Sequence, residues 1–236
     1  MARPLAQAPP PTTKAGQGER QAAATLHRAG SSRVTEPGSG TAVVTLSDDV
    51  VLLRPWTRIE ASFIAGASRD PAIDRYNSPP HSLEDALAVI ESFERSWQAF
   101  AVTDNPTGVA FAIVDAASGE LVGMCGVDEW SSTDVAQIGY WLAAPARGRG
   151  FATRAVMLMT GWLFRLGAAR VFLTVVSENV ASAAVARRAG FTYEGTLRAH
   201  GVWRDRRQDV AVFAVLPHEW AGGSGQKVVF EEPPTT

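Results

Sequence analysis

The stretch ARGRGFAT, residues 146–153, guides the interpretation of the whole chain. An apolar run typical of a strand, residues 138–142, precedes it, and a segment typical of a helix, residues 154–167, follows it. Glycines in such a turn allow a sharp bend and a close approach to a ligand, while the first turn of a helix has unpaired N–H groups and a dipole that favours negative charge. The stretch therefore predicts a phosphate or diphosphate site, assisted by the positive charges of Arg147 and Arg149.

The same stretch is also compatible with a plain strand-to-helix turn whose arginines are solvated. Two common phosphate motifs are absent from the sequence. It has no Gly-x-x-x-x-Gly-Lys-Ser/Thr segment, which argues against a P-loop nucleotidase, and no Gly-x-Gly-x-x-Gly with a suitably spaced acidic residue, which argues against a Rossmann site. The pattern that remains is Arg-x-x-Gly-x-Ala, at Arg147, Gly150 and Ala152.

The composition of the 236 residues is typical of a globular protein with an apolar core. Apolar residues make up 46% of the chain, and the formal net charge of −2 does not favour binding to nucleic acid or to a membrane surface. Cys125 is the only cysteine, so no internal disulfide is expected and a reducing compartment, the cytoplasm, is favoured. No uninterrupted apolar run approaches the ~18 residues of a membrane-spanning helix. We expect no metal site.

Composition divides the chain into three parts. Residues 1–42 are rich in Ala, Pro, Gly, Ser and Thr and are expected to form a disordered low-complexity leader, because they offer too little apolar surface to offset the entropy of ordering. An organellar transit peptide is the less favoured alternative. Residues 43–221 are expected to form one domain, and residues 222–236 a flexible tail.

Hydrophobic periodicity predicts a mixed α+β domain. The helices are predicted at residues 56–68, 82–98, 154–167 and 179–189. The strands are predicted at residues 42–46, 50–55, 108–114, 121–127, 135–142, 170–176, 191–197 and 210–216, with a polar, basic stretch at 198–209. The strand before the glycine loop, the helix after it and the strand at 170–176 form a βαβ unit, so the last of these is a buried parallel strand.

From residue 50 to 220 the order of these elements resembles the GNAT acetyltransferase superfamily. The Arg-x-x-Gly-x-Ala pattern resembles its acetyl-CoA diphosphate loop. Three further segments are similar to the RimJ/RimL-type branch, the ribosomal-protein N-acetyltransferases and their relatives: IGYWL at 138–142, NVAS at 179–182 and AGFTYEG at 189–195. The resemblance implies an α+β GNAT fold, with a mixed, centrally splayed β-sheet of about seven strands flanked by about four helices.

The resemblance also implies that acetyl-CoA binds where the central strands part. Asn179 is expected to contact the pantetheine arm, although an asparagine there also caps the next helix on its own. Ser182, one turn inside that helix, is expected to contact the carrier and to protonate the departing thiolate, the alternative being a small residue that serves packing. The backbone expected to bond the pantetheine arm belongs to Leu142, Ala143 and Ala144, and the amides expected to hold the diphosphate belong to Arg147, Gly148, Arg149, Gly150, Phe151, Ala152 and Thr153.

The sequence leaves open which group accepts the proton of the amine. Many relatives have a tyrosine acid four residues before the glycine of the AGF segment, and the residue there is Ala186. Glu129, Glu178 and His200 are candidates for the catalytic base, since carboxylates and imidazole suit proton transfer near neutral pH. Each of the three is also explained as a solvated side chain, and activation of the amine through ordered water needs none of them.

The sequence thus predicts an acetyl-CoA-dependent N-acetyltransferase that moves an acetyl group to a primary amine by direct attack in a ternary complex. The acceptor is a protein N-terminus or a small amine, and the basic residues of 198–209 are candidates for contact with an acidic acceptor or with CoA phosphates. Cys125 is interpreted as a small apolar strand residue rather than as an acetyl carrier. The alternative function is a non-catalytic acyl-CoA-binding module with a regulatory or interaction role. No nucleic-acid or membrane partner is predicted, and an exposed final strand makes a homodimer plausible.

Overall fold

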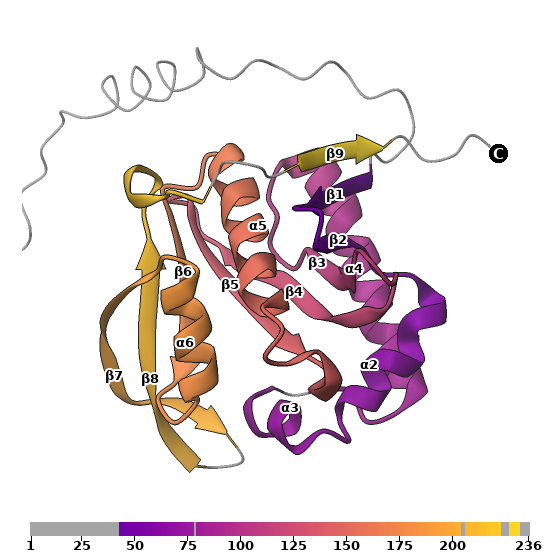
Figure 1. Ribbon diagram of the computed structural model, residues 1–236, viewed down its shortest axis with the longest axis horizontal. Coiled ribbons are helices and arrows are strands. Elements are labelled where there is room, and N and C mark those ends of the chain that lie inside the picture. The colour runs from indigo at the N-terminus through magenta and orange to yellow at the C-terminus, as the bar shows by residue number, and fades with distance from the viewer. Residues whose placement is uncertain (1–42, 78, 204–205, 223–226, 232–236) are drawn as a thin grey trace, which may run out of the picture. The chain divides into compact units, whose positions relative to one another are not determined.

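The computed structural model describes residues 43–77, 79–203, 206–222 and 227–231, which are organised around one mixed β-sheet (Figure 1). The strands are β1 (Val43–Ser47), β2 (Val51–Pro55), β3 (Ala110–Asp115), β4 (Leu121–Trp130), β5 (Val135–Leu142), β6 (Arg170–Val176), β7 (Thr192–Trp203), β8 (Arg206–Val215) and β9 (Lys227–Glu231). Within the described residues they lie in the order β7-β8-β6-β5-β4-β3-β2-β1-β9. All neighbouring pairs are antiparallel except β5 and β6, which are parallel.

Five α-helices and three short 3₁₀ turns connect these strands in the described part of the chain. The helices are α2 (Ala61–Ala67), α3 (Pro71–Tyr76), α4 (Leu83–Thr103), α5 (Phe151–Arg165) and α6 (Val180–Arg188), and the turns are η1 (Arg58–Glu60), η2 (Ala144–Ala146) and η3 (Pro217–Glu219). Local chemistry explains where several helices begin. The Ser82 hydroxyl accepts the Asp85 amide at 3.0 Å to cap α4, and the Asn179 side chain accepts the Ser182 amide at 3.1 Å to cap α6.

Alternating residues of β3 divide the core between the two faces of the sheet. Phe111 and Ile113 pack with the apolar side of α5, whereas Ala112 and Val114 pack with α2 and α4. Trp162 of α5 lies edge-on to Phe111, with ring centroids 5.4 Å apart. This packing fixes α5 on the sheet, and with it the glycine loop that precedes the helix (Figure 1).

The central strands β5 and β6 part after a short stretch of pairing. They are paired only at Val135–Gln137 and Arg170–Phe172, near the beginning of each strand. Beyond that point β5 pairs with β4 as far as Leu142, and β6 pairs with β8 as far as Val176. The expected mixed α+β fold with a central splay is therefore confirmed, and one edge of each strand faces the gap.

Two elements enlarge the fold beyond the predicted set. The sequence analysis predicts no helix between residues 68 and 82, but the Asp70 side chain caps α3 and Pro71 occupies its first position, where a missing N–H costs nothing. Strand β9 lies within the expected flexible tail, residues 222–236, and pairs with β1. Its sequence, KVVFE, has high β-propensity despite its short length.

The stretch 198–209, predicted as a polar connection, continues β7 and β8 as a hairpin. A change of register between Leu197 and Gly201, where Ala199 has a φ of 51°, allows the two strands to stay paired through the polar sequence. The pairing resumes at Gly201 with Gln208. The predicted leader, residues 1–42, lies outside the described residues. Among the described helices, none combines the length and the apolar character that a bilayer crossing requires.

Candidate active site

The glycine loop presents a row of unpaired backbone amides. Gly148 and Gly150 have φ angles of 76° and 87°, and a Cβ at either position would meet open space. These left-handed conformations turn the chain so that α5 begins at Phe151. The amide N–H groups of residues 148–153 form no hydrogen bond to any group in the described residues. The loop is therefore a preformed anion site at a helix N-terminus.

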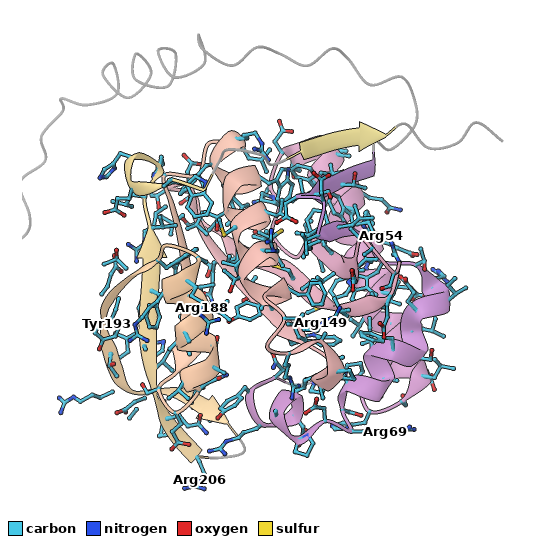
Figure 2. All side chains as sticks on the ribbon, in the orientation of Figure 1. Arg54, Arg69, Arg149, Arg188, Tyr193 and Arg206 are labelled. Atoms are coloured by element: carbon cyan, nitrogen blue, oxygen red, sulfur yellow. The ribbon has the colours of Figure 1, made fainter. Side chains whose placement is uncertain are left out.

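The arginines around this loop are already paired with carboxylates. Arg149, which is labelled in Figure 2, lies 2.9 Å from Asp115. Its guanidinium stacks over the Phe151 ring at 4.6 Å from the centroid. Arg154, in the first turn of α5, lies 2.8 Å from Asp48. The sequence analysis expects Arg147 and Arg149 to contribute net positive charge. The carboxylate partners reduce that contribution, so the amides are the donors left for an anion.

Arg147 connects the loop to the end of β5 and to α3. Its guanidinium donates to the Leu142 carbonyl at 3.2 and 3.0 Å and contacts the Asp70 carboxylate at 2.5 Å. Partial burial raises the pKa of Asp70, but the hydrogen bonds from Arg147 and from the Ala72 amide outweigh it and hold that pKa below its ordinary value. The ion pair therefore joins the anion loop to the beginning of α3.

The backbone at residues 142–144 is less open than the sequence analysis expects. The Leu142 carbonyl is occupied by Arg147, and the Ala143 amide donates to the Val122 carbonyl at 2.9 Å. The carbonyls of Ala143 and Ala144 accept amides of the η2 turn at 3.0 and 3.2 Å. Because backbone groups alternate in direction along a strand, the Leu142 amide and both backbone groups of Tyr140 face the gap toward β6. The free edge thus lies slightly earlier on β5 than expected.

A cavity of about 250 Å³ lies where β5 and β6 part. Asp128 of β4 lines it, and a shift of register between Val127 and Glu129 makes Asp128 the bulged residue of its strand. Gly139 faces it on β5, and a Cβ there would come within 2.8 Å of the Asp128 Oδ2 atom. The missing side chain of Gly139 therefore makes room for the Asp128 carboxylate.

The environment of Asp128 favours its neutral form more than water does. Asp128 is an exposed residue as a whole, but its carboxylate lies against Gly139 in the wall of the cavity. Desolvation there raises the pKa of Asp128 to about 6. Such a carboxyl group is ionised at neutral pH and basic enough to accept a proton in a reaction, the range in which enzymes use general bases.

A pair of hydroxyl groups lies on another side of the same cavity. The phenol of Tyr140, on β5, and the Ser182 Oγ atom, in the first turn of α6, are 2.8 Å apart. Burial raises the pKa of Tyr140 to about 12, even though the bond to Ser182 acts in the opposite direction. Asn179, which caps α6 through its Oδ1 atom, also lines the cavity. The predicted residues Asn179 and Ser182 are thus brought together with Asp128 and Tyr140.

The arrangement described above can be compared with known proteins. Residues 51–192, more than half of the chain, match the family described as Acetyltransferase (GNAT) domain. The chain belongs to the GNAT acetyltransferase family. The uncharacterized N-acetyltransferase p20 of Bacillus licheniformis is 28% identical to it over 187 residues, which are 75% of this chain and 99% of that protein.

Two solved structures of GNAT proteins share this fold. Mycobacterium smegmatis RimJ, in complex with CoA-disulfide, is 23% identical, with a TM-score of 0.62 over 79% of this chain and 92% of that one. RimL, the ribosomal L7/L12 α-N-protein acetyltransferase, in complex with coenzyme A, is 20% identical, with a TM-score of 0.62 over 71% of this chain and 94% of that one. The GNAT assignment is thus confirmed, with RimJ and RimL among its structural neighbours.

The GNAT domain places the three predicted bases away from the cavity at the splay. Glu129 is exposed beyond the bulge of β4, and His200 is exposed on β7; neither lines that cavity. Glu178 is bound to Arg75 of α3 at 2.5 Å. Asp128, Tyr140 and Tyr76 are the ionisable residues that line the cavity. The sequence analysis does not name Asp128 or Tyr140 as a candidate site residue. Gly139 is the one sequence feature connected with Asp128, because it leaves room for the carboxylate. That connection becomes visible only once the register of β4 and β5 is known.

Two other side chains are excluded from chemistry by their burial. Cys125 is fully buried in β4, and burial raises the pKa of its thiol, so it is a poor nucleophile. This agrees with its interpretation as an apolar strand residue. Ala186, at the position where many relatives have a tyrosine, is fully buried on the inner face of α6.

Proposed function

We propose that this GNAT protein transfers the acetyl group of acetyl-CoA to a primary amine by direct attack in a ternary complex. The observation that carries the proposal is the row of unpaired amides at residues 148–153, which lies at the end of the strand whose edge faces the parted sheet. A diphosphate at these amides leaves an extended arm to follow β5 back toward the cavity. From Leu142 to Ile138 that edge is roughly 14 Å long, at about 3.4 Å per residue.

Asp128 is proposed as the general base. The neutral amine attacks the thioester carbonyl carbon, a C–N bond forms, and the C–S bond breaks. The surplus proton of the amine passes to the Asp128 carboxylate, directly or through one water molecule. Asp128 thus replaces Glu129, Glu178 and His200 in this role, because it lines the cavity at the splay and has a pKa of about 6.

The hydroxyl pair is proposed to supply the proton that the departing thiolate needs. Ser182 is the donor closest to the carrier in this account, and Tyr140 holds its hydroxyl in place at 2.8 Å. The Asn179 side chain, whose Oδ1 is used in the cap, keeps its amide NH₂ group for the carrier. Positioning of the amine and the thioester in one cavity supplies much of the remaining acceleration, since effective molarities reach ~10⁵ M or more.

The test is release of free thiol from acetyl-CoA with a panel of amines: peptide N-termini, a polyamine, free amino acids and an aminoglycoside. The proposal expects release with at least one class and binding of CoA in a separate titration. Binding of CoA without release for every amine favours the alternative, a non-catalytic acyl-CoA-binding module. Failure to bind CoA contradicts both functions.

A further inference from the structure

A second and larger cavity, of about 620 Å³, adjoins the cavity at the splay. Val176, at the end of β6, lines both of them. Arg75 and Glu178 line the larger cavity, and the residues that follow them in the chain, Tyr76 and Asn179, line the smaller one. The two cavities therefore lie next to each other at the end of β6.

The charged groups of the larger cavity have an excess of positive charge. Three guanidinium groups, those of Arg75, Arg206 and Arg207, face two carboxylates, Glu178 and Asp209. Glu178 is bound to Arg75 at 2.5 Å, and the Asp209 Oδ1 atom accepts a backbone amide at 2.7 Å. Both carboxylates are thus engaged.

Arg206 and Arg207 form no ion pair with any carboxylate of the described residues. Figure 2 shows Arg206 at the beginning of β8. Arg207 donates to a backbone carbonyl at 3.4 Å, a weak contact. Guanidinium groups bind carboxylates through paired N–H donors, so these two side chains offer a place for an acidic group.

The two cavities differ in the charge that they favour. Asp128 carries the negative charge of the smaller cavity, which suits an amine, and the arginines of β8 carry the surplus positive charge of the larger one. Val210 of β8 lines the smaller cavity, and Arg207 and Arg206 precede it by three and four residues. Along an extended strand these steps correspond to roughly 10 and 14 Å.

This separation limits the acceptors that can use both cavities. The reach of the arginine side chains shortens the distance that the acceptor has to span. An extended peptide advances about 3.3 Å per residue, so two to four residues are enough to span what remains. A free amino acid is too short, and a polyamine has no group for the arginines. A peptide N-terminus with an acidic side chain shortly after it satisfies both cavities.

Building on the proposed function, we infer that the acceptor is the N-terminus of a polypeptide with Asp or Glu among its second to fourth residues. Its α-amine lies beside Asp128, and its carboxylate is bound by Arg206 and Arg207.

The test compares peptides of one sequence that carry Glu, Gln or Lys at positions three and four, in the thiol-release assay. We expect kcat/KM to be about tenfold higher for the Glu peptide than for the Gln peptide, since two partly exposed ion pairs contribute modestly. Added salt should reduce that preference. The variant R206Q/R207Q should lose it, so that its kcat/KM values for the Glu and Gln peptides become equal, and Arg198→Gln, an exposed arginine on β7 outside the cavity, should retain it.

Each outcome distinguishes the inference from the function on which it rests. Equal kcat/KM values for the Glu and Gln peptides, or a preference that survives in R206Q/R207Q, overturn the acidic-peptide inference and leave the acetyltransferase proposal standing. A polyamine that is acetylated faster than every peptide also overturns the inference. Absence of thiol release with every peptide and every small amine counts against the proposed function itself.

Discussion

The hydroxyl groups of Tyr140 and Ser182 lie 2.8 Å apart and join β5 to α6 across the space where the central strands part. Tyr140 belongs to β5 and Ser182 to α6, so the bond also fixes the position of the serine hydroxyl relative to the free edge of β5. Burial raises the pKa of Tyr140 to about 12, so the phenol is protonated throughout the neutral range. The phenol therefore keeps its proton at the pH at which we propose that the pair acts as a donor.

Removal of this pair should slow the chemical step and leave CoA binding unchanged. We expect Ser182→Ala to lower kcat about 100-fold, the usual contribution of a general acid, and Tyr140→Phe to lower it about tenfold because the serine remains. The double variant should be no slower than Ser182→Ala, because the two hydroxyls act as one unit. Steady-state thiol release and a CoA titration measure these effects. A full kcat in Ser182→Ala would exclude the proposed donor.

Replacement of Asp128 should remove the base. We expect Asp128→Asn to lower kcat about 100-fold, whereas Glu129→Gln, the adjacent carboxylate outside the cavity, should stay near the wild-type value. In the wild type, kcat should rise with pH through about 6, since only ionised Asp128 accepts a proton. The Asn variant should lack this rise. A pH profile of kcat for both variants decides between the two carboxylates, and a larger loss in Glu129→Gln would reverse the assignment.

Asp128 should also make stability depend on pH. Its pKa in the folded protein, about 6, lies above the ordinary value of 3.8, so the unfolded chain ionises first as pH rises. The folded state therefore loses stability between pH 4 and 6, and Asp128→Asn avoids that loss. Because solvent reaches the side chain, we expect the wild type to lose only about 1 kcal/mol of its free energy of unfolding. The variant should therefore show a Tm gain of about 2–4 °C.

Thermal denaturation at pH 4 and pH 8 measures this effect. The gain in Tm of Asp128→Asn over the wild type should be present at pH 8 and absent at pH 4, while Glu129→Gln controls for the general loss of a carboxylate. An equal gain at both values would show that Asp128 is not desolvated in the fold.

Substitutions at Gly150 should separate backbone strain from charge. The residue has a φ of 87° and faces open space, so Gly150→Gln and Gly150→Glu carry the same conformational cost, about 1 kcal/mol. Only the glutamate also sets a negative charge beside the amides. We expect CoA affinity to fall much further in Gly150→Glu than in Gly150→Gln, as measured by calorimetric titration.

Gly167, which has a φ of 97° and open space at the other end of α5, provides the matched control. Gly167→Glu should bind CoA as the wild type does. If Gly150→Glu and Gly150→Gln lose affinity equally, strain rather than charge explains the loss, and the anion site at this loop is not supported.

The parts of the site that were predicted from the sequence are those set by local chemistry. Gly148 and Gly150 before a helix, and Asn179 as a cap, follow from residues adjacent in the chain. The splay of β5 and β6 depends on strand pairing across the sheet, and only the resemblance to the GNAT superfamily indicated it. The same non-local pairing is why the stretch 198–209 was mistaken for a connection.

The residues missed by sequence analysis depend on the register between strands. Asp128 faces the cavity because β4 carries a bulge opposite Ile138 and Gln137, and a one-residue change of register would have turned Glu129 inward instead. Tyr140 and Ser182 are 42 residues apart, so no local pattern connects them. Arg147 and Asp70 are 77 residues apart in the sequence. Their ion pair neutralises the positive charge that the sequence analysis expects Arg147 to offer to a ligand.

The central claim is that the amides of residues 148–153 hold the diphosphate of CoA and direct its thiol into the gap between β5 and β6. A crystal structure of the protein with CoA measures this most directly. The account predicts diphosphate oxygens within hydrogen-bonding distance of those amides and the sulfur atom in the cavity lined by Asp128 and Ser182. A diphosphate bound elsewhere, or a sulfur atom outside that cavity, would contradict it.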